Sequence, residues 1–311
     1  MVSFELFILG SSSTLPTSKR YPTAHLLKVD ERFFLIDCGE GTQIQLRKFG
    51  LNPGRIHRIF ISHLHGDHVY GLFGLLSTMG MMGRKVPLHL YGTPRLREMM
   101  EQHFSFFGSL PFPLEYHAPS SNPLTPIFED EKITVTPIPL KHRITTFGYL
   151  FREKKRLLNV RKDEVERYGM GVADLVRIKQ GEDFITSDGS LIQNKKLTHP
   201  PYHPRSYAYI SDTLFDPDLA GVLKNVDLLF HEATFSNKDA KLAAQTKHST
   251  SGQAATLAKM AGAKKLLIGH FSSRYRDHGV LEEEARTIFP HTDGVKDGDI
   301  YSLPLERVST E

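Results

Sequence analysis

Four side chains that can bind a metal ion fall within six residues of this chain, at His63, His65, Asp67 and His68. They follow the short apolar run 59–61, which predicts a buried strand. Residues two apart at an extended strand end point the same way, so His63 and His65 can converge on one metal. Gly66 permits a sharp turn, after which Asp67 and His68 point elsewhere. The spacing predicts two metals side by side, zinc first with manganese or iron as alternatives, rather than a polar solvated turn.

Three more ligand-type residues follow predicted strands, and these are His142 after 133–140, Asp212 after 206–210 and His270 after 265–269. A carboxylate at a strand end, such as Asp212, can bridge two cations because one oxygen can reach each. A histidine in the place of His142 is more often structural, but a zinc that holds His63 and His65 still lacks a third nitrogen. We expect these residues to lie along one edge of packed sheets, where loops carry function on a rigid scaffold.

The elements that must position these residues are mostly short apolar runs. Further strands are predicted at 4–9, 24–29, 33–37, 86–91, 146–152, 228–230 and 300–303. Helices are predicted at 43–49, 69–82, 94–104, 240–245, 252–261 and 282–289. Asp37, at a strand end, could orient a metal-bound histidine or could simply stabilise a turn. The polar loop 10–14 is either a plain turn or part of the site rim.

The segment from about 153 to 204 differs from the rest of the chain. Its hydrophobic periodicity weakens, and basic residues such as Lys162, Arg167 and Lys179 are set among fewer acids. We interpret it as an inserted flexible arm that projects from the fold and could meet a phosphate backbone. A mobile, solvated surface insertion is the alternative.

The composition indicates the cellular compartment in which the protein works. Hydrophobic residues make up 40% of the 311 residues, the net charge is +4 and the sequence pI is about 9.0. Cys38 is the single cysteine, so no internal disulfide can form, which fits a reducing compartment. We see no signal peptide and no apolar run of the ~18 residues that span a bilayer. We therefore expect a cytoplasmic protein without a membrane segment.

The H-x-H-x-D-H pattern at 63–68 resembles the signature motif of the metallo-β-lactamase superfamily. The resemblance implies an α/β fold, the αββα sandwich, with the metal site at one edge of the sheets. The motif does not imply a substrate, because that superfamily includes lactamases, thioesterases, phosphodiesterases, nucleases and redox proteins.

Later motifs sharpen the resemblance: H-E-A-T at 231–234, H-S-T at 248–250, D-C-G-E-G-T at 37–42 and the strand end Gly269–His270. With the inserted arm, the whole chain resembles the short form of the ribonuclease Z family of tRNA 3′-processing endonucleases. This implies one domain over 1–311 that removes the 3′ trailer of precursor tRNA and leaves a tRNA 3′-hydroxyl and a trailer 5′-phosphate. It also implies two Zn²⁺ per subunit, with Mn²⁺ as an alternative, and a homodimer.

The family resemblance assigns roles to individual residues. One zinc takes His63, His65 and His142, the other takes Asp67, His68 and His270, and Asp212 bridges them. Asp67 is also the expected proton acceptor, and His248 is expected near the scissile phosphate as proton donor or stabiliser. His231 and Glu232 are expected to support the site from behind, and the arm to grip the tRNA elbow.

Two rival functions remain on the sequence alone. One is a small-molecule phosphodiesterase or a thioesterase-type hydrolase on the same fold, and the other is a non-catalytic RNA-binding protein. The arm and the H-E-A-T and H-S-T segments argue against the first, and the complete set of seven ligands argues against the second. The family's arm commonly carries a Gly-Pro pair, whereas residues 169–174 here contain no proline. This departure concerns the conformation of the arm and leaves the metal chemistry unchanged.

Overall fold

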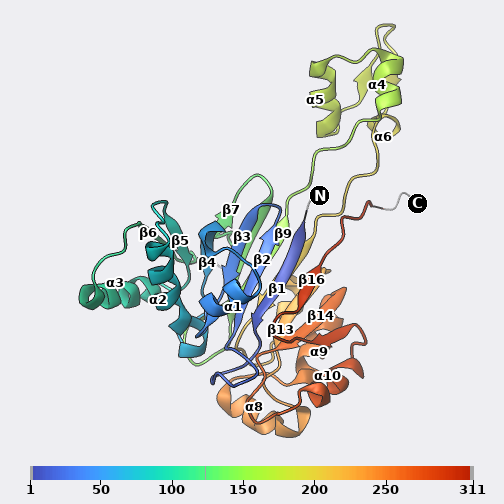
Figure 1. Ribbon diagram of the computed structural model, residues 1–311. Coiled ribbons are helices and arrows are strands. Elements are labelled where there is room, and N and C mark those ends of the chain that lie inside the picture. Colours follow the sequence, from blue (N-terminus) through green and yellow to red (C-terminus); the bar gives the residue numbers. More distant parts are fainter. Residues whose placement is uncertain (1–2, 123, 309–311) are drawn as a thin grey trace.

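Two seven-stranded sheets lie face to face in the computed structural model, which describes residues 3–122 and 124–308 (Figure 1). The first sheet has the order β16 (Ile300–Ser302), β1 (Phe4–Gly10), β2 (Ala24–Val29), β3 (Arg32–Ile36), β4 (Ile56–Phe60), β5 (Leu88–Tyr91) and β6 (Leu114–His117). The second has the order β15 (Thr292–Gly294), β14 (Lys265–Gly269), β13 (Leu228–Glu232), β12 (Ser206–Ile210), β9 (Thr146–Glu153), β8 (Ile133–Leu140) and β7 (Phe128–Glu129).

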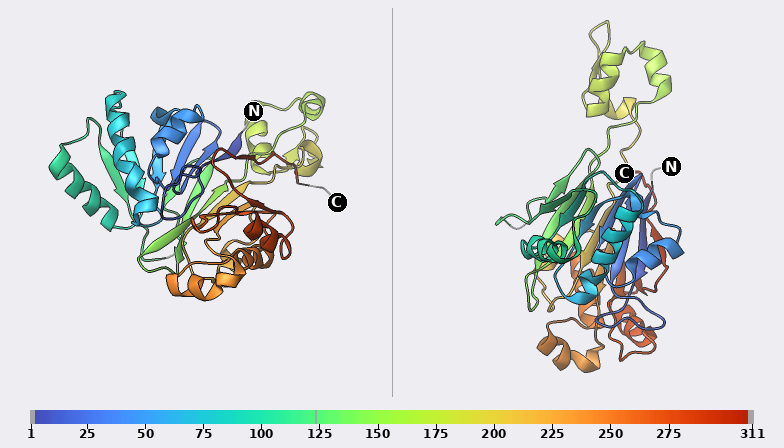
Figure 2. Two further views of the ribbon diagram at one scale, coloured as in Figure 1. Left: turned by 60° about the horizontal axis from the view of Figure 1, so that its bottom comes forward. Right: turned by 60° about the vertical axis from the view of Figure 1, so that its left-hand side comes forward.

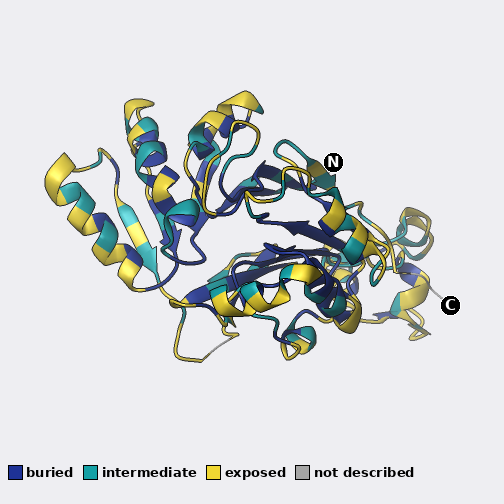
Figure 3. Cartoon of the chain, turned by 90° about the horizontal axis from the view of Figure 1, so that it is seen from below, coloured by how far each residue is buried: buried dark blue, intermediate teal, exposed yellow. Residues whose placement is uncertain are grey.

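Helices cover the outer face of each sheet (Figures 1 and 3). The first sheet carries α1 (Thr42–Lys48), α2 (Gly66–Met81) and α3 (Arg95–Phe107), and a short 3₁₀ turn at Pro53–Arg55 precedes β4. The second carries α7 (Leu219–Val222), α9 (Ser251–Ala261) and α10 (Gly279–Arg286), and α8 (Ala240–Thr246) follows a 3₁₀ turn at Asn237–Asp239. This is the αββα sandwich, so the fold expected from the sequence is confirmed. None of the described helices is both long and apolar enough to cross a membrane.

Burial on both faces explains why the strands appear in the sequence as nearly continuous apolar runs. Successive side chains of a strand point to opposite faces, so Ile59 packs under the helices while its neighbour Phe60 packs between the sheets. Phe60 stacks on Tyr91 with ring centroids 4.4 Å apart and meets Phe151 of the opposite sheet at 5.3 Å. Three apolar layers therefore hold the strand ends rigidly in place.

The segment between β9 and β12 leaves the sandwich and forms a small separate body (Figures 1 and 2). It contains α4 (Lys162–Tyr168), α5 (Val172–Gln180), α6 (Asn194–Leu197) and a hairpin of β10 (Phe184–Ile185) with β11 (Leu191–Ile192). These elements enclose a core of their own, made of Met170, Ile178, Phe184 and Leu197. We call residues 154–204 the arm.

The arm has more regular structure than the weak periodicity of its sequence indicates. The stretch 169–174 lacks the Gly-Pro pair that is common in the family. Gly169 ends α4 there with φ of 58°, a left-handed conformation that favours glycine. The N–H of Gly171 then donates to Asp174 Oδ2 at 3.1 Å, which fixes the start of α5. The stretch 169–174 is therefore a tight helix–turn–helix connection.

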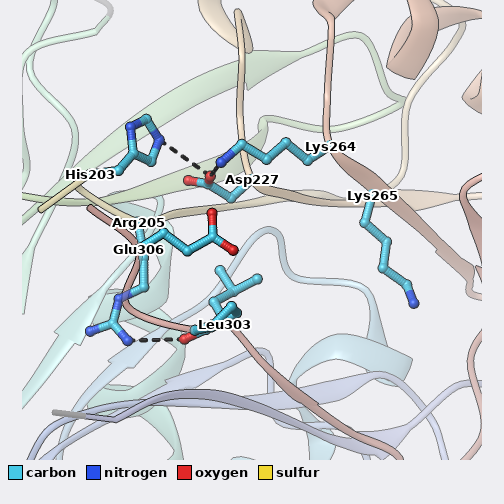
Figure 4. Close-up of a pocket in the computed structure, with 8 residues that line it drawn as sticks. His203, Arg205, Asp227, Lys264, Lys265, Leu303 and Glu306 are labelled. Atoms are coloured by element: carbon cyan, nitrogen blue, oxygen red, sulfur yellow. Dashed lines mark hydrogen bonds and ion pairs between the residues drawn. The ribbon is translucent and has the colours of Figure 1, made fainter. Parts of the chain in front are cut away.

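A buried ion pair closes the sandwich beneath the arm. Arg205 donates from Nε to Glu153 Oε2 at 2.9 Å and from Nη2 to Glu153 Oε1 at 2.8 Å. The pocket beside this pair is lined by His203, Arg205, Asp227, Lys264, Lys265, Leu303, Pro304 and Glu306 (Figure 4). Within it Asp227 already pairs with Lys264 at 2.7 Å and with His203 at 3.4 Å. We assign no chemistry to this pocket because its ionic groups are largely matched to one another.

Candidate metal centre

All seven predicted metal ligands meet at one edge of the sandwich. His63 and His65 follow β4, and Asp67 and His68 lie in the first turn of α2. The opposite sheet supplies His142 after β8, Asp212 after β12 and His270 after β14. The ligands form two groups, His63, His65, His142 and Asp212 in the first and Asp67, His68 and His270 in the second.

Asp212 lies between the two groups and turns one oxygen to each. Its Oδ2 is 3.5 Å from His63 Nε2 and 3.7 Å from His142 Nε2. Its Oδ1 is 3.4 Å from His68 Nε2 and 3.3 Å from His270 Nε2. This is the arrangement of a carboxylate that two cations share.

The remaining distances also fit metal coordination. His65 presents Nδ1, which lies 2.9 Å from His63 Nε2 and 3.4 Å from His142 Nε2. Asp67 Oδ2 lies 3.3 Å from His270 Nε2. A tetrahedral ion with bonds of 2.0–2.2 Å spaces its ligands by about 3.3–3.6 Å. The separations within the two groups lie between 2.9 and 3.7 Å, around this spacing, so each group can surround a cation.

Electrostatics at the cluster favour cations. Burial lowers the pKa of His63, of His65 and of His142, so these rings are neutral and offer lone pairs. Burial also disfavours the charged form of His68, but Asp212, Asp67 and Asp37 outweigh it and raise the pKa of His68. Three carboxylates around one buried ring create a site where positive charge is stabilised.

Asp37 holds one of the ligand rings from behind. His68 Nδ1 donates to Asp37 Oδ2 at 2.7 Å, and the Tyr209 hydroxyl donates to the same oxygen at 2.6 Å. Ser62 donates from its N–H to Asp37 Oδ1 at 2.7 Å and from its hydroxyl to Oδ2 at 2.8 Å. Of the two interpretations that the sequence left open, the structure favours Asp37 as the residue that orients a ligand.

Two other ligand rings are fixed by groups at the end of β13 and in the segment that follows it. His270 Nδ1 donates to Thr234 Oγ1 at 2.9 Å, and this hydroxyl donates in turn to Glu232 Oε2 at 2.7 Å. His142 Nδ1 donates to the carbonyl oxygen of Lys247 at 2.8 Å. Lys247 adopts a left-handed conformation with φ of 58°, which is uncommon for lysine. The sequence could not predict this contact, because every residue type carries a backbone carbonyl that can accept a hydrogen bond.

His248 lies beside the cluster and is held by Glu232. Its Nδ1 is 3.0 Å from Glu232 Oε1 and 3.9 Å from Asp212 Oδ2. Burial disfavours the imidazolium, but Glu232 and Asp212 outweigh it and raise the pKa of His248 to about 9. Because Nδ1 is engaged by Glu232, Nε2 is the nitrogen left to reach a substrate. His231 instead turns Nδ1 to the carbonyl of Glu232 at 2.6 Å and lies fully buried in the core.

The predicted metal ligands open into a pocket of about 420 Å³. His65, Asp67, His142, Asp212 and His248 line it together with Ser13, Thr14, Gly66, Arg143, Thr234, Phe235, Thr246 and Ser272. Thr14 donates its backbone N–H to Asp67 Oδ2 at 2.7 Å. The loop 10–14 therefore lies at the rim of the site, which is one of its two expected roles.

Close backbone packing brings α2 to the site. A Cβ atom on Gly71 would lie 1.9 Å from the carbonyl oxygen of Gly39, so only glycine fits there. The N–H of Gly71 donates to the carbonyl of Cys38 at 2.9 Å. The D-C-G-E-G-T turn thus contacts the helix that carries Asp67 and His68.

Comparisons with known proteins agree with this geometry. A family model described as "Anti-Pycsar protein Apyc1" matches residues 4–111. The chain is 45% identical over 304 residues to ribonuclease Z of Bacteroides fragilis, covering 97% of this chain and 100% of that protein. It is 46% identical over 293 residues to ribonuclease Z of Bacteroides thetaiotaomicron, covering 94% and 93%.

Two solved structures share the fold. The short form of human tRNase Z matches with a TM-score of 0.69 at 26% identity, covering 96% of this chain and 99% of that one. The metallo-β-lactamase fold protein YhfI from Bacillus subtilis also matches with a TM-score of 0.69, at 18% identity, covering 96% and 99%. Fold and site together define a metal-dependent hydrolase of the metallo-β-lactamase class, with two groups of His and Asp side chains that can hold metal ions. Within this class the chain belongs to the ribonuclease Z family, which confirms the family and the enzyme type predicted from its motifs.

Proposed function

We propose that this protein is a zinc-dependent endoribonuclease that removes the 3′ trailer of precursor tRNA. The observation that carries the proposal is Asp212, which turns one oxygen to each of two histidine groups in a chain 45% identical to a ribonuclease Z. The human structural relative is named as a tRNase Z, which supports tRNA as the substrate. An RNA substrate would place the protein in the cytoplasm, in keeping with its single, buried cysteine.

We assign two Zn²⁺ per subunit to the seven ligands, with Mn²⁺ as the alternative. Five imidazoles and two carboxylates form a donor set that zinc prefers. When bound, the two ions supply positive charge opposite the scissile phosphate and make a water molecule more acidic. His63, His65 and His142 would hold one ion, Asp67, His68 and His270 the other, and Asp212 both.

The catalytic roles go to Asp67 and His248. Burial disfavours the charged form of Asp67, but His68 and His270 outweigh it and lower the pKa of Asp67, so its carboxylate is ionised. It lines the pocket and can accept the proton of the attacking water. His248, kept protonated by Glu232, can donate from Nε2 to the departing 3′ oxygen of the tRNA.

End-group mapping of a cleaved precursor tests this function. Purified, zinc-loaded protein is incubated with precursor tRNA that carries a labelled 3′ trailer. We expect one cut at the end of the acceptor stem, leaving a tRNA 3′-hydroxyl and a trailer 5′-phosphate. Turnover of a small phosphodiester without any cut in the precursor would move the substrate to a small molecule.

We further propose that the arm binds tRNA away from the metals. Its helices expose basic side chains such as Lys162, Lys179, Lys195 and Lys196, and α5 also exposes Val172 and Val176. The arm projects from the sandwich at the start of β12, whereas Asp212 follows the opposite end of that strand (Figure 1). The arm can therefore bind the shape and backbone of the RNA without touching the cleavage site. In this proposal the single domain 1–311 has a substrate-binding element that is separate from its cleavage site.

Removal of the arm should weaken tRNA binding and spare the chemistry. Val160 and Thr198 form a β-bridge, so a short glycine linker can replace residues 161–197 and leave the Glu153–Arg205 pair intact. We expect the KM for precursor tRNA to rise at least ~10-fold, as expected when several phosphate contacts are lost. Turnover of bis(p-nitrophenyl) phosphate is the control. Equal loss on both substrates would mean that the arm supports the fold instead.

We propose a homodimer that forms through α2 and α3. The side chains of Met81 and Phe107 are 79% and 76% exposed, and both line a groove of about 510 Å³ with Phe73, His103 and Phe104. The His103 ring stacks on Phe73 at 4.1 Å and on Phe107 at 4.6 Å. Apolar surface gathered in this way is typical of a protein interface.

Phe107→Glu should convert a dimer into a monomer, because it places a charge in the apolar contact. Size-exclusion chromatography with light scattering measures the mass directly. Val280→Glu, at an exposed apolar residue of α10, is the matched control and should stay dimeric. A wild-type protein that is monomeric at micromolar concentration would contradict the proposed homodimer.

A further inference from the structure

Three side chains outside the metal centre form another ligand group on the edge strands β5 and β6. His89 Nδ1 lies 3.1 Å from His117 Nε2 and 3.2 Å from Glu115 Oε2. The three ligand atoms all lie within 4.8 Å of one another. The separations of 3.1 and 3.2 Å from His89 Nδ1 are close to the ligand spacing of about 3.3 Å around a tetrahedral ion with 2.0–2.1 Å bonds.

The backbone places these residues on one face. The two strands pair in parallel with His89 opposite Glu115 and Tyr91 opposite His117. Residues two apart on a strand point the same way, so His89 lies on the side of Tyr91, which faces the space between the sheets. The group therefore sits where the inter-sheet core reaches solvent, with His89 and Glu115 28% and 49% exposed.

The imidazole of His117 is held in place by aromatic packing. Its ring stacks on Tyr91 with centroids 4.5 Å apart and planes at 17°, and Tyr91 in turn stacks on buried Phe60 at 4.4 Å. A ring fixed in this way loses little freedom when it binds a ligand. The group is thus pre-organised by the core rather than by flexible loops.

Hydrogen bonds among the three side chains do not give every ligand atom a partner of its own. His89 Nδ1 has one hydrogen or one lone pair, yet it faces both a histidine nitrogen and a carboxylate oxygen. Burial and the neighbouring His89 lower the pKa of His117, so its ring is neutral and offers a lone pair. Arg58 of β4 also faces this group and opposes a cation, although its guanidinium rests on the Phe128 ring at 4.2 Å.

We propose that His89, Glu115 and His117 bind a third divalent transition-metal ion, of the Zn²⁺ class. Two imidazoles and one carboxylate leave a fourth position for water. Bound there, the ion would link β5 to the edge strand β6. Because Arg58 lies nearby and the site is partly exposed, we expect it to bind more weakly than the dinuclear centre.

Calorimetric titration of the two-zinc protein with further Zn²⁺ tests the proposal, with metal content measured after dialysis. Wild type should show one additional, weaker binding event and a third ion per chain. Glu115→Gln keeps the shape of an exposed side chain, and His117→Gln removes a nitrogen ligand. Each substitution should lower the affinity for the third Zn²⁺ at least ~10-fold. Loss of a residue that only supports a metal ligand already weakens metal binding by about this factor, so loss of a ligand should cost no less.

His291→Gln, at an exposed histidine outside the group, is the matched control and should bind like wild type. Hydrolysis of bis(p-nitrophenyl) phosphate should be unchanged in all three variants, which separates this site from the dinuclear centre. Absence of a third event in wild type overturns the proposal. So does a third event that persists unchanged in both Glu115→Gln and His117→Gln, because the ion would then bind elsewhere.

Discussion

Asp212→Ala should abolish cleavage of precursor tRNA and remove metal from the protein. Its two oxygens face four histidine nitrogens at 3.3–3.7 Å, so its loss removes a ligand from both groups at once. We expect kcat/KM to fall at least about 10³-fold, which corresponds to ~4 kcal/mol of transition-state stabilisation. Metal analysis of the purified variant should find fewer than two ions per chain.

A nearby aspartate provides the control for this experiment. Asp218 is exposed and lies outside both ligand groups, so Asp218→Ala should keep its activity and both ions. Circular dichroism of both variants separates loss of metal from loss of fold. Near-normal turnover with two bound ions in Asp212→Ala would show that the bridging assignment is wrong.

His248→Asn should lower kcat about 10²–10⁴-fold, the range that general acid catalysis supplies, with little change in KM. The side chain contacts Glu232 and lies at the rim of the ligand groups, so both ions should remain bound. Single-turnover cleavage of precursor tRNA, together with metal analysis, measures the two effects separately. His199→Gln, at an exposed histidine of the arm, is a control for the substitution itself.

The pH profile distinguishes an acid from a purely structural histidine. A proton donor with a raised pKa is active below that pKa, so kcat should fall as the pH rises through the pKa of His248, about 9. Glu232→Gln removes the anion that raises the pKa, so this limb should move to lower pH. A limb at the same pH in both proteins would exclude His248 as the titrating donor.

The sequence predicted that the side chains of the metal ligands would converge because most of them directly follow a buried strand, with Asp67 and His68 one turn later at the start of α2. Apolar runs such as 59–61 and 206–210 are buried on both sides, and the polar residue that ends each run has to lie at the sheet edge. Convergence of His63, Asp212 and His270 follows from strand order, which the family resemblance supplied and periodicity alone did not.

Other features had no local signal. Strands β6, β7 and β15 are short edge strands whose pairing depends on neighbours far along the chain, so the sequence alone did not predict them. Tyr209 donates to Asp37 across the two sheets, a contact between residues 172 positions apart. The arm was predicted as an insertion, but its helices are held by a four-residue core too small to produce clear periodicity.

The way the arm is joined to the sandwich has a consequence for how such an enzyme can diversify. Beyond the bridge between Val160 and Thr198, two chain segments join the arm to the sandwich. Among the described residues the core of the arm shares none with the three layers of the sandwich, and the Glu153–Arg205 pair lies at the junction. Substitutions or length changes beyond Val160 and Thr198 therefore leave the catalytic strands undisturbed. With the arm as the proposed RNA-binding element, affinity for the RNA and the chemistry of cleavage can be inherited and altered separately, as two modules within one polypeptide.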